Sequence, residues 1–509
     1  MKTRSFGWLL FVLWIEAWGG TLACAQIGEP GGREYWVGAV QTGAPANPTL
    51  PFMVTLWRES GVTKGALDIP PSVGIGGAWA VELLNADITP ARIDLVQASA
   101  NPQSAPNQFS LVREPVGGDT ATGKLLIGGS AELAARMWKV SAAEAADFMP
   151  RRPQHPLPTR PYEERRVKVP STRAGETVEV EGVLTLPGTA GPHPAVVLVA
   201  ALDVHDVDHS SMGHKPFLVL ADRLARAGFA TLRTQNRTPS RPGLAPATQL
   251  TIEQLGSEAA ERAAWLATQQ GIDPARIGLV GLNEGGTAAA VAAVAAKSPV
   301  KCLVMLAPKA MTGLDQLRAE VSEGMMREGE KPEFVAERAA SMMKPYELLV
   351  AGVPGPEVIS AIESEMTMQR AARRQQLGEA SADVVKGLAE QQYLIINTDE
   401  FRRNLAFDPA PIFARLSQPT LAILGGKDVR FPASANAPAL KTALSGQVGI
   451  EITVRIGDNL NHRLQPALSG SMDEVQEIEL TIDESVLSDI IAFLSRHLGV
   501  PNSPEESSK

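Results

Sequence analysis

A glycine-flanked turn in the middle of the chain has the arrangement that presents a catalytic side chain. An apolar run at residues 276–282 leads into the sequence GLNEG at 281–285, and a stretch rich in alanine follows. This pattern predicts a strand, a sharp turn and a helix. Small residues let such a turn tighten and expose its central side chain, as in G-x-S-x-G nucleophile turns. The central residue here is Asn283, so an amide occupies the nucleophile position.

Two later residues could complete a catalytic set. Asp428 ends the segment ILGGKD, and His462 lies in GDNLNH after the next apolar run. A histidine oriented by a carboxylate can act as a general base toward a nucleophile. Because both residues follow consecutive predicted strands, we expect them to lie at the same edge of the sheet as Asn283.

The chemistry of Asn283 argues against ordinary acyl-enzyme catalysis. Its amide nitrogen lone pair is delocalised into the carbonyl, so a histidine cannot activate it as it activates a serine hydroxyl. No second G-x-S-x-G is present in the chain. Two alternatives stay open. Deamidation would give an aspartate nucleophile, although Glu284 rather than glycine follows, which makes deamidation slow. Alternatively, His462 and Asp428 could activate water directly.

A second polar cluster, DVHDVDHSSMGH at residues 203–214, contains residue types that bind divalent metals. Imidazoles and carboxylates at this density suit Zn²⁺, which would allow metal-assisted hydrolysis at the loop from His205 to His209. The alternative is a polar loop at the end of a strand. The spacing matches no established metal motif, so we expect neither a metal nor a cofactor.

The elements that must position these residues divide into two parts. Residues 26–148 contain short apolar or alternating runs separated by Gly, Pro, Asn and Ser, which predict a small antiparallel barrel or sandwich. Helical periodicity first occurs at 130–138. Residues 149–164 are rich in proline and predict an extended, semi-rigid linker.

From residue 165 to about 500, strands alternate with helices. This rhythm predicts an α/β fold with a mostly parallel, doubly wound sheet covered on both faces. Residues from about 314 to 404 interrupt it with helical sequence, which we interpret as a cap or an additional helical layer. Residues 501–509 form a polar tail.

The N-terminus predicts export. Lys2 and Arg4 precede a short apolar stretch at 8–15, and Ala23-Cys24-Ala25 provides a cleavage site, so residues 1–25 are expected to be a signal peptide. The stretch is too short for a permanent membrane span. Acylation at Cys24, as in a lipoprotein, is the alternative, but Thr21 stands where the motif needs leucine. Cleavage leaves Cys302 as the single cysteine, so no disulfide within the chain is expected.

Composition excludes several classes of protein. Hydrophobic residues make up 44% of the chain and charged residues 20%, which is ordinary for a globular protein. The formal net charge is −9. Nucleic-acid binders usually carry a basic surplus, so nucleic acid is not an expected partner.

Residues 162–499 resemble secreted bacterial α/β-hydrolases of the carboxylesterase and serine-aminopeptidase-like group, which include a preceding β-rich domain. The matching stretches are residues 213–228, 281–286, 401–411, 423–432 and 460–474. The resemblance implies an α/β-hydrolase fold, with Asp428 as the acid and His462 as the base. Such proteins normally read G-H-S-E-G-G at the turn, so Asn283 replaces the nucleophilic serine and Leu282 the histidine beside it. Their G-S-G-P loop, which supplies an oxyanion donor, is replaced here by residues 201–204.

The resemblance and the residues therefore imply different functions. The resemblance implies hydrolysis of a carboxylic ester or a similar acyl compound. The substituted turn favours a pseudo-hydrolase that binds a small ester-like ligand, an acyl compound or a protein partner in the same crevice.

Overall fold

The structure is a computed structural model that describes most of the chain. The described residues are 32–44, 47–59, 61–70, 78–97, 105–129, 131–148, 151–157, 159–173, 176–202, 205–235, 250–327, 329–372, 382–447 and 451–499. The expected signal peptide at 1–25, with Cys24, and the expected tail at 501–509 lie outside them.

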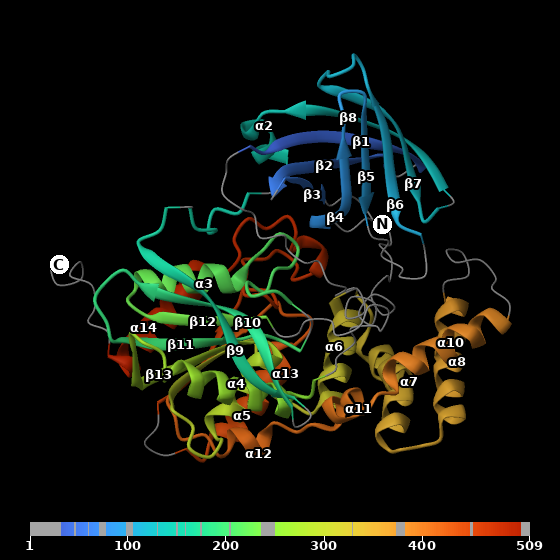
Figure 1. The fold of residues 1–509 in the computed structure, drawn as a ribbon. Coiled ribbons are helices and arrows are strands. Elements are labelled where there is room, and N and C mark those ends of the chain that lie inside the picture. The colour runs from blue at the N-terminus through green and yellow to red at the C-terminus, as the bar shows by residue number, and fades with distance from the viewer. Residues whose placement is uncertain are drawn as a thin grey trace.

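The N-terminal part is a closed antiparallel barrel (Figure 1). Its strands are β1 (Glu34–Ala44), β2 (Asn47–Glu59), β3 (Val62–Ile69), β4 (Ala78–Ile88), β5 (Arg92–Gln97), β6 (Asn107–Arg113), β7 (Thr120–Ile127) and β8 (Ala131–Val140). β8 pairs with β1 and closes the barrel. Side chains fill the interior, and Trp36, Phe52 and Phe109 are almost completely buried there. A short helix, α2 (Ala142–Phe148), packs Ala145 against Val37 and Met53.

The helical periodicity at residues 130–138 was misleading, because residues 131–140 form the strand β8. β8 pairs with both β7 and β1, so its backbone hydrogen bonds are made within the sheet. Its alternate residues Ala135 and Met137 are buried in the barrel. Strand pairing on both sides therefore overrides the helix propensity of an alanine-rich segment.

The second part contains an 8-stranded, mostly parallel sheet in the order β16-β15-β14-β13-β11-β12-β10-β9. The strands are β9 (Tyr162–Arg173), β10 (Glu176–Pro187), β11 (His193–Val199), β12 (Ala230–Thr234), β13 (Ile272–Leu282), β14 (Val300–Leu306), β15 (Thr420–Gly425) and β16 (Ile452–Gly457). β10 pairs antiparallel with both β9 and β12, whereas β11 to β16 run parallel to one another.

Helices cover both faces of this sheet, as the strand–helix alternation predicted (Figure 1). One face packs against α4 (Ile252–Leu266), α5 (Glu284–Ala293), α12 (Ala410–Phe413) and α13 (Ala433–Leu444). The other face packs against α3 (Pro216–Arg226) and α14 (Glu484–Leu498). Each face has its own apolar core, so the strands are buried on both sides and read as continuous apolar runs.

A helical insertion lies between β14 and β15, as the sequence predicted. It comprises α6 (Gly313–Arg327), α7 (Pro332–Val350), α8 (Gly355–Ala372), α10 (Ala382–Ile396) and α11 (Asp399–Ala406). The insertion has its own core around Met343, Val358 and Ile396. None of the described helices is both long and apolar enough to cross a membrane.

Part of the segment predicted to be an extended, semi-rigid linker contacts the α/β part. β9 begins at Tyr162, inside the range 149–164. Gln154 is only 6% exposed and makes hydrogen bonds to residues 481 and 482 of the α/β part. The side-chain amide of Gln154 carries both a donor and an acceptor, so it can pair with backbone far along the chain, which a local composition argument does not reveal.

The buried Cys302 gives a simple test of the packing of the central sheet. It lies fully buried on β14, and burial raises the pKa of its thiol to about 12. Only the thiolate is nucleophilic. We expect the chain beginning at Gln26 to react with no equivalent of a thiol reagent at pH 8 in the folded state, and with one after denaturation. Fast reaction of the folded chain would contradict the structure.

Candidate active site

The order of the strands has a switch point at the carboxyl edge of the sheet, between β11 and β13. β11 lies between β12 and β13, and the chain leaves β11 toward β12 but leaves β13 toward β14. Connections that diverge from adjacent parallel strands open a crevice at their carboxyl ends, where ligands bind in open α/β sheets. Asn283 directly follows β13 and therefore lies at this position.

Asn283 has the strained backbone of a sharp strand-to-helix turn. Its φ is 56° and its ψ is −125°, and α5 begins at the next residue. Its N–H donates to the carbonyl of Leu306 (2.8 Å), and its own carbonyl accepts from the N–H of Gly286 (2.9 Å). Asparagine tolerates positive φ better than most residues, although such a conformation still costs free energy.

Gly285 is required by the close approach of this turn to β11. A Cβ atom at position 285 would lie 2.2 Å from the carbonyl oxygen of Val199 and 2.4 Å from that of Ala200. Both contacts are with backbone, which cannot move aside without displacing a central strand. The glycine therefore fixes how deeply the turn sits in the sheet, and with it the place of the Asn283 side chain.

Asp428 and His462 form a buried pair, as the sequence predicted. His462 Nδ1 lies 2.9 Å from Asp428 Oδ2, and the two residues are 2% and 1% exposed. The other oxygen, Asp428 Oδ1, accepts from the N–H groups of Arg430 (2.8 Å) and Phe431 (2.7 Å). A carboxylate only accepts, so the Nδ1–H of His462 donates to Asp428, and in the neutral imidazole Nε2 is then the acceptor.

A tight turn around His462 holds the imidazole in place. Asn461 Oδ1 accepts from the N–H groups of Arg463 (2.9 Å) and Gln465 (3.0 Å), and Asn461 Nδ2 donates to Gln465 Oε1 (3.0 Å). The turn packs closely on the strand that ends before Asp428, since a Cβ at Gly425 would lie 2.4 Å from the carbonyl oxygen of Asn461. The ring of Phe431 contacts the imidazole edge-on, with the centroids 4.9 Å apart.

Two buried acceptor atoms at the candidate site have no hydrogen-bond partner among the described residues. They are Asn283 Oδ1 and His462 Nε2. No hydrogen bond joins Asn283 to His462 or Asp428 in the part of the chain that the structure describes. The structure thus brings Asp428 and His462 into contact and places Asn283 at the same edge of the sheet. Two acceptors need donors from a third group, such as a bound molecule.

The first amide of α5 resembles half of an oxyanion site. In hydrolases with this turn, one donor is the N–H of the residue after the nucleophile, which is Glu284 here. That N–H makes no hydrogen bond within the described ranges. The second donor would come from residues 201–204, of which 203 and 204 lie outside the described residues. One of the two expected donors is therefore in place.

The loop with His205 and His209 is held by contacts within the protein. The two imidazoles pack edge to face with their centroids 4.7 Å apart, and His209 also packs against Phe217. The Asp206 carboxylate accepts from the N–H and the hydroxyl of Ser210. Among described residues, no group of three or more His, Cys, Asp or Glu side chains could hold a metal ion. Asp203 lies outside those residues.

Asp208 of the same loop has a partner on the sheet. Its Oδ1 accepts from Arg233 Nε at 2.9 Å, and Arg233 is 3% exposed. Arg233 also donates to Glu164 and Thr185. These contacts give the loop a structural role at the end of β12.

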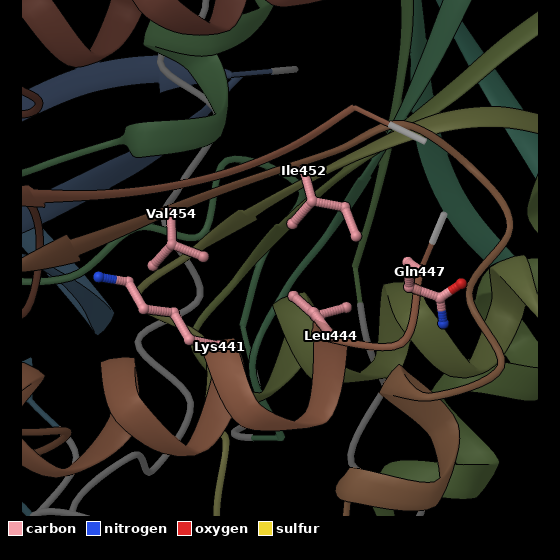
Figure 2. Close-up of a pocket in the computed structure, with 5 residues that line it drawn as sticks. All are labelled: Lys441, Leu444, Gln447, Ile452 and Val454. Atoms are coloured by element: carbon pink, nitrogen blue, oxygen red, sulfur yellow. The ribbon is translucent and has the colours of Figure 1, made fainter. Parts of the chain in front are cut away.

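A separate groove lies at the edge of the sheet, away from these residues. Figure 2 shows side chains of α13 facing those of β16 across it. Its volume is about 350 Å³, and it is lined by Lys441, Leu444, Gln447, Ile452 and Val454. Asn283, Asp428 and His462 do not line it. The groove is therefore separate from the candidate catalytic residues.

His214, the last residue of the polar cluster at 203–214, lies beside the turn that follows His462. It is buried, with Nδ1 3.0 Å from Thr481 Oγ1 and Nε2 2.9 Å from the carbonyl oxygen of Val475. Gln465 Nε2 lies 3.0 Å from His214 Nε2, which connects His214 to the turn of His462. Burial, together with the positive charge of Arg152, lowers the pKa of His214 to about 3.

Comparisons with known proteins found similarity to an esterase. No family model matches the chain. The esterase EstD of Thermotoga maritima is 26% identical over 318 residues, which cover 62% of this chain and 65% of that protein. The chain is similar to an esterase.

Solved structures that resemble the chain include an esterase and a peptidase, both with low TM-scores. An esterase of Pyrococcus furiosus, Pf2001, is 14% identical with a TM-score of 0.38, and the match covers 66% of this chain and 94% of that one. The acylaminoacyl peptidase of Pyrococcus horikoshii is 12% identical with a TM-score of 0.42, and the match covers 90% of this chain and 64% of that one.

The lowered pKa of His214 predicts how stability depends on pH. The unfolded chain binds a proton at His214 near pH 6.5, whereas the folded chain does so only near pH 3. Stability from this residue is therefore complete above pH 6.5 and falls as the pH drops toward 3. Between pH 7 and 5 we expect wild type to lose about 2 kcal/mol more than His214→Gln. Urea unfolding at both pH values measures it, and an equal loss in both proteins would contradict the assignment.

Proposed function

We propose that this protein is an exported pseudo-hydrolase that binds a small ester-like or acyl ligand at the β11–β13 crevice without turning it over. The observation that carries the proposal is the amide of Asn283 on an intact nucleophile turn, at the same sheet edge as an ordered Asp428–His462 pair. The similarity to an esterase supports the class of ligand.

The absence of a hydroxyl at position 283 removes the step on which such enzymes depend. A serine forms the acyl intermediate after a histidine takes its proton, and an amide has no proton that this histidine can remove to make a nucleophile. Losing the serine of a triad costs about 10⁶-fold in rate, which corresponds to about 8 kcal/mol of barrier. Binding depends on other groups and survives this loss.

The polar atoms at the crevice define which ligands suit it. Asn283 Oδ1 and, in the neutral imidazole, His462 Nε2 can each accept a hydrogen bond, and the N–H of Glu284 can donate one. A ligand with a hydroxyl or amide N–H beside a carbonyl group would satisfy these atoms. Small acyl compounds with a neighbouring hydroxyl fit this description better than plain apolar esters.

A second function deserves a test because the Asp428–His462 pair is complete. With Nε2 as a free acceptor, His462 could remove a proton from water that attacks a bound ester directly, which is general base catalysis worth about 10²–10⁴-fold. This route needs no nucleophile at position 283.

Restoring the serine distinguishes the two functions. We expect wild type to hydrolyse a short-chain p-nitrophenyl ester no faster than His462→Ala, and Asn283→Ser to gain at least about 10²-fold, since the hydroxyl is the missing member of the triad. The double variant Asn283→Ser/His462→Ala should lose that gain. Hydrolysis by wild type that His462→Ala abolishes would overturn the binding role and support direct activation of water.

Export is a separate part of the proposal, supported by the sequence of residues 1–25. When the full chain is expressed in a bacterium with an outer membrane, we expect a periplasmic product whose N-terminal residue is Gln26. Cys24→Ser is the matched control, because it removes the acylation site and keeps a small residue before Ala25. Cytoplasmic protein that retains Met1 would contradict export. A membrane-bound product that only Cys24→Ser releases would show a lipoprotein.

A further inference from the structure

The segment that enters the α/β part after the barrel is attached to the turn that carries His462. The attachment runs through residues 476–483, which lie between η1 (Met472–Glu474) and α14. One side of this segment binds Arg152 and Gln154, and the other side binds the residues that follow His462.

Gln154 pairs with backbone as a neighbouring strand would. Its Oε1 accepts from the N–H groups of Thr481 (2.7 Å) and Ile482 (3.0 Å), and its Nε2 donates to the carbonyl of Ile482 (2.6 Å). It is 6% exposed, so loss of these bonds would leave buried backbone groups without partners. A single side chain thus fixes two consecutive residues of the segment.

Arg152 holds the other end of the same segment. Its guanidinium donates to the carbonyls of Gln476 (2.9 Å) and Ile478 (3.2 Å), and to that of Met212 (3.2 Å). These are charge-assisted bonds in a partly buried place, where they are stronger than neutral ones. Two residues of the proline-rich stretch therefore bind the segment near both of its ends.

The far side of the segment supports the turn of His462 directly. The carbonyl of Leu480 accepts from Gln465 Nε2 (2.9 Å), and the N–H of Asp483 donates to the carbonyl of Leu464 (2.9 Å). Gln465 in turn bonds to Asn461, the residue before His462. Hydrogen bonds, joined through the backbone of residues 480–483, thus connect Gln154 to the residue beside the imidazole.

The backbone of this turn needs such support. Leu464 is buried and has a φ of 58°, a left-handed conformation that is unfavourable for a leucine. Strained residues persist only where their surroundings over-determine them. The bond from Asp483 to Leu464 is one of those constraints, and it lies on the segment that Arg152 and Gln154 clasp.

We propose that Gln154 is a positioning residue for His462, and that the segment after the barrel is a built-in part of the candidate site. Gln154 acts through residues 480–483 and touches no reacting atom. The proposal rests on the assignment of His462 and Asp428 as the surviving pair. It does not depend on whether the protein turns over an ester.

The proton on His462 Nδ1 reports this role, because its hydrogen bond to Asp428 gives a low-field NMR signal. The signal is assigned by its loss in His462→Gln. Gln154→Met keeps the side-chain volume and removes the hydrogen bonds. We expect exchange of this proton with solvent to become about tenfold faster in Gln154→Met, and to stay unchanged in Leu157→Ala, an exposed residue of the same stretch.

A purely structural role for Gln154 gives a different result. In that case Gln154→Met lowers the thermal unfolding midpoint while the exchange of the His462 proton stays within twofold of wild type, and the proposal is wrong. Should Gln154→Met fail to fold, Arg152→Met loosens the same segment from its other end, and the same two outcomes apply. The ester assay on Asn283→Ser tests the proposed function separately, so failure of one leaves the other standing.

Discussion

The backbone of Asn283 is fixed from both sides of its turn, and the rest of the candidate site is arranged around it. Its N–H bonds to β14 and its carbonyl to the first turn of α5, while Gly285 brings α5 against β11. These contacts come from the sheet rather than from the side chain at position 283. The turn can therefore keep its strained φ whatever residue occupies it. The conformation of this turn is therefore compatible with an amide side chain at position 283.

Without a hydroxyl at position 283, the Asp428–His462 pair is an oriented hydrogen-bonding group and has no serine to activate. A buried imidazole with its Nδ1 proton on a carboxylate is an oriented acceptor, and an unpartnered buried acceptor costs free energy until a donor reaches it. The same holds for Asn283 Oδ1. A site with such unpartnered acceptors favours a ligand that brings hydrogen-bond donors. Preorganised polar atoms can provide affinity because they lower the cost of binding.

The sequence predicted those features that depend on local pattern. The alternation of strands and helices, the helical insertion and the contact between Asp428 and His462 all follow from short motifs at the ends of strands. The strand β8 was missed, because its alanine-rich sequence has helical periodicity and only pairing with β7 and β1 decides its conformation. The supports of His462 were missed too. Gln154 and Ile482 lie more than 300 residues apart in the chain, and no local signal connects them.

Through these long-range contacts, the proline-rich segment both follows the barrel and completes the structure of the α/β part. It follows the barrel in the chain, yet its polar side chains complete the hydrogen bonds of a loop beside the candidate site. Prolines reduce the conformational freedom of the unfolded chain, so less entropy is lost when Arg152 and Gln154 are held in place. A flexible linker of glycine and serine would lose more entropy in the same position and would hold the loop less firmly. The composition that suggested a spacer therefore also suits a segment that must stay bound to the loop supporting His462.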